Sequence, residues 1–252
     1  VAMNIAMTLR RFGLSPTLLS HIGTDSEGDS LIAACASLGV ATDYVTRAQG
    51  LPTDIYMAIE GANGLVAAVA DAHSLERAGD AILAPLNDGR LGNATTPYKG
   101  IAALDGNLTE PLLVAIAASP LFAHMDLRIA PASPGKAERL RPLLRHPRAT
   151  FYVNVEEAEI ICGAKYETAA TAADGLIGRG ARRVLVTDGP RTASYRGPGV
   201  ALSAAPPNVH QARVTGAGDT FMAAHIAAEL GGNAPADALR NALTAAATYV
   251  SG

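Results

Sequence analysis

The stretch "RVTGAGDTFMAAHIAAEL", residues 213–230, places two glycines and an aspartate in front of an apolar, alanine-rich helical run. Glycine weakens a helix, so Gly216-Ala217-Gly218 needs a reason to stand at a helix start. The first helical turn leaves backbone N–H groups unpaired, and glycines let an anion approach them without a Cβ in the way. Asp219 would repel a phosphate there, unless it takes a proton from a hydroxyl that attacks this phosphate. The pattern therefore indicates phosphotransferase chemistry.

A plainer interpretation of the same residues is structural, and the local pattern alone favours it. Thr215 would cap the helix, the glycines would form a tight turn, and Asp219 would interact with the helix dipole. Other phosphate motifs fit worse. There is no GxxxxGK sequence, which excludes a Walker-type site, and "GAGDTF" lacks the third glycine of a dinucleotide fingerprint, which leaves a Rossmann site as a minor alternative.

Length and composition limit the class of protein. The chain has 252 residues, of which 49% are hydrophobic and 17% charged, and its formal net charge is −3. These values predict one domain over 1–252, located in the cytoplasm, that binds neither nucleic acid nor membrane through bulk charge. Cys35 and Cys162 lie in apolar helical stretches without CxxC spacing, so we expect buried reduced thiols.

Short apolar runs alternate with amphipathic helical runs, which predicts an α/β fold with a mainly parallel sheet flanked by helices. A continuous helix is expected over 135–146, and further helices over 26–39, 109–119, 156–163 and 168–180. Ligands of such sheets collect beyond the carboxyl ends of the strands, so Asp105, Asn107, Asn154 and Asp188 should share one rim. The expected strands are 17–23, 100–107, 126–133, 150–154 and 183–189.

The segment 53–71 breaks the alternation. Two extended runs flank the turn Gly61-Ala62-Asn63-Gly64, which predicts a β-hairpin without a helix between its strands. Such an insertion can act as a lid over a ligand or pair with another subunit, and an edge hairpin without function is the alternative. Its exposed strand edges favour a homodimer formed through the lid.

Four motifs in this order resemble the ribokinase-like (PfkB) carbohydrate and nucleoside kinases. They are "VAMNIAMTLRRFG" (1–13), "HIGTDSEGDSL" (21–31), "VNVEEAEIICG" (153–163) and "VTGAGDTF" (214–221), which are similar to the GGxxxN, G-x-D-x-x-G, N-x-x-E and carboxy-terminal signatures of the family. The resemblance covers essentially the whole chain and implies a three-layer ribokinase-like fold. It also implies the cofactors ATP and Mg²⁺, with a monovalent cation such as K⁺ as an additional candidate.

Three further stretches resemble the pseudouridine kinases of that family: "GLVAAVADAHSLE", "LDGNLTEPLL" and "IAPASPGKAERLRP". The resemblance implies phosphorylation of a hydroxymethyl group of a ribosyl substrate, with the 5′-hydroxyl of pseudouridine as the expected acceptor. One alternative is a ribokinase- or fructokinase-like sugar kinase. The other is a kinase-derived nucleoside-binding protein with little activity.

The resemblance assigns the catalytic roles. Asp219 would deprotonate the acceptor hydroxyl, while the amides of Gly216-Ala217-Gly218 would stabilise charge on the transferred phosphoryl group. Asn154 and Glu157 would act on magnesium, largely through water. Without the family, these two residues are better interpreted as a helix cap and its capping box.

The binding residues follow from the same motifs. Thr187 and Gly189 match the start of the nucleotide turn, and Thr215 and Gly218 are expected to contact the nucleotide as well. Met222 and His225 are assigned to packing. The acceptor-side candidates are Asn4, Gly23, Asp25, Gly28, Thr53, Tyr56, Asp105 and Asn107.

Some residues depart from the family pattern. The chain as given starts at Val1, inside the GGxxxN motif, so we expect the family's N-terminal strand, which carries an acidic substrate ligand, to be absent from it. Thr192 replaces the second glycine of the nucleotide turn. Arg213 stands where the family has other residues, and it would pair with a phosphate or disturb a monovalent-cation loop. These two interpretations of Arg213 stay open.

Overall fold

The central sheet has six strands, in the order β10-β9-β8-β7-β6-β5. The computed structural model describes residues 1–61 and 64–252. Strands β5 to β8 are parallel to one another, whereas β9 and β10 continue the sheet as an antiparallel edge. The bounds are β5 (Ile101–Asp105), β6 (Asp126–Ala130), β7 (Ala149–Asn154), β8 (Arg183–Asp188), β9 (Arg191–Gly197) and β10 (Val200–Ala204).

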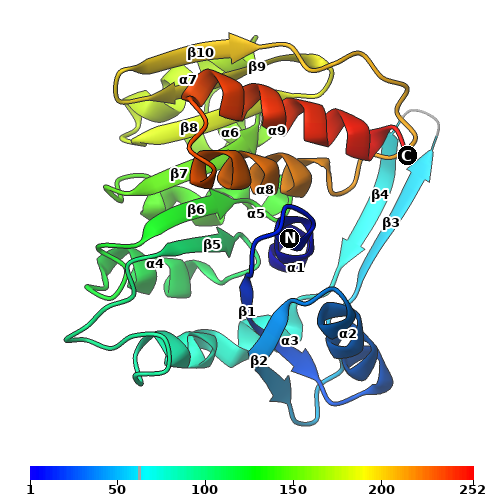
Figure 1. The fold of residues 1–252 in the computed structure, drawn as a ribbon, viewed down its shortest axis with the longest axis vertical. Coiled ribbons are helices and arrows are strands. Elements are labelled where there is room, and N and C mark those ends of the chain that lie inside the picture. Colours follow the sequence, from blue (N-terminus) through cyan, green and yellow to red (C-terminus); the bar gives the residue numbers. More distant parts are fainter. Residues whose placement is uncertain (62–63) are drawn as a thin grey trace.

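Two layers of helices cover the sheet because alternate strand side chains point to opposite faces. Phe151 and Val153 pack with the helices of one face, whereas Tyr152 between them packs with those of the other. The first layer holds α4 (Glu110–Ala118), α5 (Pro134–Ala137), the 3₁₀ helix η2 (Glu138–Leu143), α6 (Val155–Cys162) and α7 (Ala169–Gly178). The second holds α1 (Ala2–Arg11), α8 (Ala217–Leu230) and α9 (Pro235–Val250), with α8 and α9 side by side in Figure 1.

The helix predicted over 135–146 is present only in part as a regular α-helix. The structure has the short α5, then η2, and a turn that ends before β7. Pro142 lies inside η2, and a proline supplies no backbone N–H for an α-helical hydrogen bond, so a regular helix is not sustained here. The other predicted helices agree with α2, α4, α6 and α7 to within one or two residues.

The amino-terminal part forms a smaller parallel sheet. Strands β1 (Thr17–Gly23) and β2 (Ala41–Ala48) pair with each other, and α2 (Ser26–Ser37) connects them. After the lid, α3 (His73–Ala78) and the 3₁₀ helix η1 (Gly79–Leu86) lead back to β5. Cys35 and Cys162 are buried free thiols, as predicted.

The predicted lid hairpin is present as β3 (Tyr56–Gly61) and β4 (Gly64–Ala70), paired antiparallel. Ala62 and Asn63 of the predicted turn lie outside the described residues. In Figure 1 the two strands extend as an arm from the smaller sheet. Large apolar side chains of both strands are exposed, among them Met57, Ile59 and Val69.

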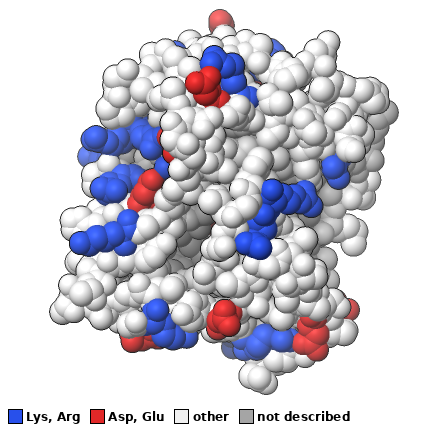
Figure 2. All heavy atoms as spheres, in the orientation of Figure 1, with Lys and Arg blue, Asp and Glu red and all other residues white. Residues whose placement is uncertain are grey.

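Charge is distributed sparsely over the face seen in Figure 2. Lysine and arginine side chains stand there in separate groups within a mostly uncharged surface. That face therefore lacks the continuous basic strip that would attract the phosphate backbone of a nucleic acid. Of the helices in the described part, none is both long and apolar enough to span a membrane.

Candidate active site

The turn that opens α8 is built by glycine. Gly216 is the N-cap with a φ of +92°, in the left-handed region, and no side chain caps the helix. A Cβ at Gly216 would lie 2.6 Å from the Tyr249 hydroxyl, which itself donates to the Thr215 carbonyl at 3.0 Å. A Cβ at Gly218 would meet nothing within 4 Å. Gly216, and not Thr215, therefore occupies the N-cap position, and the space beside Gly218 is open.

Asp219 stands in the first turn of α8, behind these glycines. Asn4 of α1 donates its Nδ2 to Asp219 Oδ2 at 2.8 Å, which fixes one carboxylate oxygen. Burial raises the pKa of Asp219, the Asn4 hydrogen bond lowers it, and the nearby carboxylate of Asp105 raises it. A carboxylate with a raised pKa and one oxygen held in place is suited to accept a proton.

Helix α1 connects the end of β5 with Asp219, because it hydrogen-bonds to both. Asp105 Oδ2 accepts from the Ala2 amide at 3.0 Å, and Asp105 Oδ1 accepts from the Asn107 amide at 2.9 Å. Lys136 of α5 donates its Nζ to Asn107 Oδ1 at 2.9 Å. The structure thus joins the predicted residues Asn4, Asp105, Asn107 and Asp219 along one rim, and it adds Lys136.

The end of β7 carries both predicted magnesium residues in a capping box. Asn154 Oδ1 accepts from the Glu157 amide, and Glu157 Oε2 accepts from the Asn154 amide, each at 2.8 Å. Burial raises the pKa of Glu157 to about 7, the hydrogen bond from the Asn154 amide lowers it, and Glu156 and Asp219 raise it further. The capping box that the structural interpretation predicts is therefore present.

The predicted nucleotide residues lie at the end of β8. Thr187 pairs in register with Asn154 of β7, so both belong to the rim. Gly189 has a φ of +55° in the tight turn to β9, where glycine is the least strained residue. Asp188 forms an ion pair with Arg191 at 2.5 Å. The β9–β10 hairpin that follows this turn was not predicted, because "VTDGPRTASY" was interpreted only as a nucleotide motif.

A second group of predicted residues surrounds the start of α2. Asp25 is its N-cap and accepts from the Gly28 amide at 3.0 Å and from the Thr53 amide at 2.7 Å. The Thr53 hydroxyl also donates to Asp25 and accepts from the Gly23 amide. A Cβ at Gly23 would lie 2.5 Å from the Thr53 amide nitrogen, and one at Gly28 would lie 2.4 Å from the Gly23 oxygen, so both positions need glycine.

The two predicted lid residues differ in their surroundings. Thr53 is 3% exposed and precedes β3, so it belongs to the Asp25 group rather than to the lid surface. Tyr56 begins β3 and is 52% exposed. Tyr56 is therefore free to approach a ligand, whereas Thr53 fixes the loop from which the lid extends.

Arg213 and His225 have partners that sequence reasoning missed. The Arg213 guanidinium lies 4.1 Å from the centre of the Tyr249 ring and donates to the Tyr249 carbonyl. His225 is fully buried and hydrogen-bonds the Tyr152 hydroxyl at 2.9 Å, so its assignment to simple packing was incomplete. Met222 is buried in the core, as predicted.

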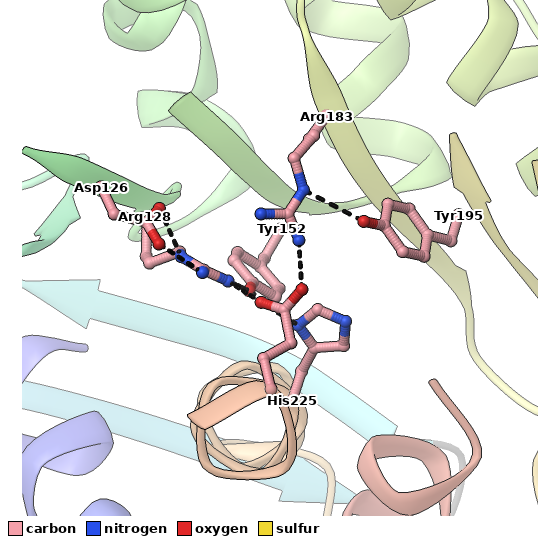
Figure 3. A network of polar contacts seen from close by, with 7 residues as sticks. Asp126, Arg128, Tyr152, Arg183, Tyr195 and His225 are labelled. Carbon is pink, nitrogen blue, oxygen red and sulfur yellow. Dashed lines mark hydrogen bonds and ion pairs between the residues drawn. The ribbon is translucent and has the colours of Figure 1, made fainter. Parts of the chain in front are cut away.

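Figure 3 shows the buried polar network around His225, under the carboxyl half of α8. Arg128 pairs with Asp126 at 2.6 Å and with Glu229, and Arg183 pairs with Glu229 as well. Tyr195 accepts from Arg183 at 3.0 Å. Burial lowers the pKa of His225 to about 4, Glu229 raises it, and the two arginines lower it further. The network fastens α8 to β6 and β8 at the end remote from Asp219.

A cavity of about 490 Å³ extends into the molecule from Asp105 at this rim. Its lining comes mainly from apolar side chains of α1, β1, β5 and η1, and Asp105 is the charged residue that reaches it. Asp219 does not line it. The predicted base therefore lies outside this apolar cavity.

Comparison with known proteins identifies the family. A family model described as pfkB family carbohydrate kinase matches residues 1–252. A carbohydrate kinase from Agrobacterium tumefaciens is similar in structure, with a TM-score of 0.80 and 25% identity over 99% of this chain and 78% of that one. A search of curated proteins finds no match.

Two further solved structures carry ligands. A protein of E. coli assigned as ribokinase II, in complex with ATP and Mg²⁺, has a TM-score of 0.75 and 17% identity over 99% of this chain and 81% of that one. Adenosine kinase from Schistosoma mansoni, in complex with 2-fluoroadenosine, has a TM-score of 0.76 and 16% identity over 99% and 78%. The similarity of both to this chain lies in the fold. Since the family model covers the whole described rim, this chain belongs to the pfkB family of carbohydrate kinases and is a phosphotransferase that acts on a hydroxyl group.

Proposed function

We propose that this chain is an ATP- and Mg²⁺-dependent kinase that phosphorylates a hydroxymethyl group of a ribosyl substrate, with the 5′-hydroxyl of pseudouridine as its acceptor. The observation that carries the proposal is the pairing of Asp219, held by Asn4, with the open glycine turn at the start of α8. This turn offers donors for an anion, and the carboxylate next to it offers a place for a proton.

In this mechanism Asp219 accepts the proton of the acceptor hydroxyl. The hydroxyl oxygen forms a bond to the γ-phosphorus of ATP, the bond from that phosphorus to the β–γ bridging oxygen breaks, and ADP leaves with the electron pair. The turn Gly216-Ala217-Gly218 would supply amide donors to the oxygens of the phosphoryl group as charge develops on them. The Ala217 amide donates to the Val214 carbonyl at 3.1 Å in this structure, so it would have to leave that partner to take part. The proton then passes from Asp219 to solvent.

Magnesium would reach the site with ATP. Among the described residues, no group of three His, Cys, Asp or Glu side chains is placed to hold a metal ion. The capping box uses Glu157 Oε2 but leaves Glu157 Oε1 without an intrahelical task, so this oxygen fits a water of the Mg²⁺ shell. Bound Mg²⁺ would supply charge neutralisation of the phosphates, and Asn154 would hold Glu157 in place. Activity in K⁺ compared with Na⁺ tests the additional monovalent cation.

The acceptor side favours a nucleoside over a free sugar. Asp105 and Asn107 present polar groups at the rim, where hydroxyls of a ribose would bind. The lid offers the exposed Tyr56 to cover a base. The adenosine kinase of similar fold, which binds 2-fluoroadenosine, supports a nucleoside pocket in this fold. A ribokinase- or fructokinase-like sugar kinase is the alternative.

A screen of the full-length protein with ATP and Mg²⁺ tests this proposal. Pseudouridine, uridine, adenosine, ribose and fructose are offered separately, and ADP release is measured. We expect turnover with pseudouridine and little with ribose or fructose. Turnover of a free sugar with inert nucleosides refutes the nucleoside assignment, and binding of nucleosides without turnover supports the kinase-derived binding protein.

We further propose that the lid forms a homodimer contact. Ile59 of β3 and Val69 of β4 are 57% and 69% exposed, and apolar residues on unpaired edge strands are normally covered. A second copy of the hairpin would cover them. Sedimentation velocity at micromolar concentration measures this directly, and a monomer throughout contradicts it.

A further inference from the structure

No chemical role has been given above to Lys136, which belongs to a loop. It lies in α5, directly after β6, and β6 stands between β5 and β7 in the sheet. The carboxyl end of β6 therefore lies between the acceptor residues of β5 and the magnesium residues of β7. The loop packs closely against β5, because a Cβ at Gly106 would lie 3.4 Å from the Lys136 carbonyl oxygen.

The partner of the Lys136 ammonium is a neutral group. Its Nζ donates to Asn107 Oδ1 at 2.9 Å, and it makes no ion pair within the described part of the chain. The lysine is half-buried, and its charge reaches Asp71 at the end of the lid strand, where it is a minor cause of that carboxyl's lowered pKa. An ammonium has three donors, so two remain for a ligand.

Other cations near the rim are already engaged. Arg191 is paired with Asp188, and Arg213 is stacked on Tyr249. The rim itself is rich in carboxylates: Asp105 raises the pKa of Asp219, and Asp219 raises the pKa of Glu157, in addition to the larger effect of burial on both. A rim of this charge repels the triphosphate unless a cation compensates.

We propose that Lys136 is a further catalytic residue, whose ammonium binds the phosphoryl group during its transfer to the acceptor hydroxyl. The proposal rests on the reaction geometry given above, with the acceptor between Asp219 and Asn107. Lys136 neither gives nor takes a proton in the step. It supplies fixed positive charge on the acceptor side, opposite to the amides of the α8 turn.

The competing role is purely local: Lys136 would only orient the Asn107 amide. The two roles differ in which kinetic constant they change. Loss of an orienting group weakens acceptor binding and raises its KM, whereas loss of a charge on the transferred group lowers kcat. Asn107→Ala provides the matched control, since it removes the lysine's hydrogen-bond partner but keeps the charge.

Kinetics of Lys136→Met, Lys136→Arg and Asn107→Ala, with each melting temperature, test the proposal. We expect Lys136→Met to lose about 10²-fold in kcat with acceptor KM changed less than about threefold, as for loss of one transition-state donor. Lys136→Arg keeps the charge and should retain more than about a tenth of the activity. A Lys136→Met variant with unchanged kcat, or one that matches Asn107→Ala in a raised acceptor KM alone, overturns the proposal.

A binding measurement gives a second readout without turnover. Calorimetry compares the non-hydrolysable analogue AMP-PCP with ADP, both with Mg²⁺ and with the acceptor found in the screen. We expect Lys136→Met to weaken AMP-PCP about tenfold and to leave ADP unchanged, because the lysine acts on the γ-phosphoryl group. Equal affinities of wild type and variant for AMP-PCP refute the role of Lys136. A wild-type protein that binds neither nucleotide refutes the proposed nucleotide site instead.

Discussion

Replacing Asp219 by asparagine keeps the shape of the side chain and removes the proton acceptor. Asn4 can still donate to the remaining carbonyl oxygen, so the contact between α1 and α8 survives. Without a base, we expect kcat to fall by about 10²-fold to 10⁴-fold. This fall corresponds to about 3–5 kcal/mol of transition-state stabilisation, at about 1.4 kcal/mol for each factor of ten.

The free energy of unfolding of the same variant should differ little from wild type, and the sign of the difference depends on pH. Because burial raises the pKa of Asp219, the native state favours the neutral carboxyl, and its contribution to stability is lost as pH rises through that pKa. Asparagine does not ionise, so the variant should gain stability relative to wild type as the pH rises above the usual range of aspartate. The lost interaction with the helix dipole opposes this by less than about 1 kcal/mol. We therefore expect Tm within about 2–4 °C of wild type.

The assay combines kcat, nucleotide affinity by calorimetry, and Tm for Asp219→Asn. ATP with Mg²⁺ should bind as well as to wild type, or slightly better, since a negative charge near the γ-phosphate is gone. Asp237→Asn is the matched control, because Asp237 stands in the first turn of the neighbouring helix α9 and its side chain is 53% exposed. An Asp219→Asn protein that is folded and has unchanged kcat refutes the catalytic assignment and restores the purely structural interpretation.

Three further variants test other parts of the molecule. Glu229→Ala removes the carboxylate that Arg128 and Arg183 share, so urea unfolding should show a loss of about 3–5 kcal/mol, and a loss below about 1 kcal/mol contradicts the importance of the network. Glu157, with its pKa raised to about 7, must ionise to attract Mg²⁺. The affinity for ATP with Mg²⁺ should therefore rise between pH 6 and pH 8 in wild type but stay flat in Glu157→Gln. Equal pH profiles of the two proteins count against the magnesium role. Val69→Lys should turn a lid dimer into a monomer in sedimentation velocity, whereas Val114→Lys, at an exposed position on α4, should not. If both variants remain dimers, the dimer contact lies elsewhere.

Local patterns in the sequence predicted the parallel core well. Buried strands such as β7 and β8 are continuous apolar runs followed by polar residues, and this signal depends on few distant contacts. The lid followed from two extended runs around a glycine turn, although Ala62 and Asn63 of that turn lie outside the described residues. Pro142 indicates that a regular α-helix does not continue after α5, although the apolar spacing around it is typical of a helix.

Other features depend on contacts between distant segments, and the sequence alone did not reveal them. Thr53 was placed in the lid because of its neighbours in the chain, but its hydroxyl is held by Asp25, which lies 28 residues earlier. His225 looked like a packing residue on an apolar helix, since its partner Tyr152 is 73 residues away. Lys136 gave one weak signal: it is one of only three lysines and follows a strand end, where ligands of such folds bind.

The two ends of α8 perform different tasks, and the physical chemistry of each explains why they are separated. Glu229 near the carboxyl end compensates two arginines in a network that fixes the helix to the sheet. Asp219 at the amino end is a half-buried carboxylate without an ion pair to a cationic side chain in the described part of the chain, next to a turn that only glycine can form at Gly216. A counter-cation at Asp219 would stabilise the fold but lower the pKa of the base and occupy the place of the acceptor hydroxyl. If Asp219 is the base that we propose, the helix is held firmly at the end remote from the reaction, and its amino end keeps a carboxylate without a cationic side-chain partner in position.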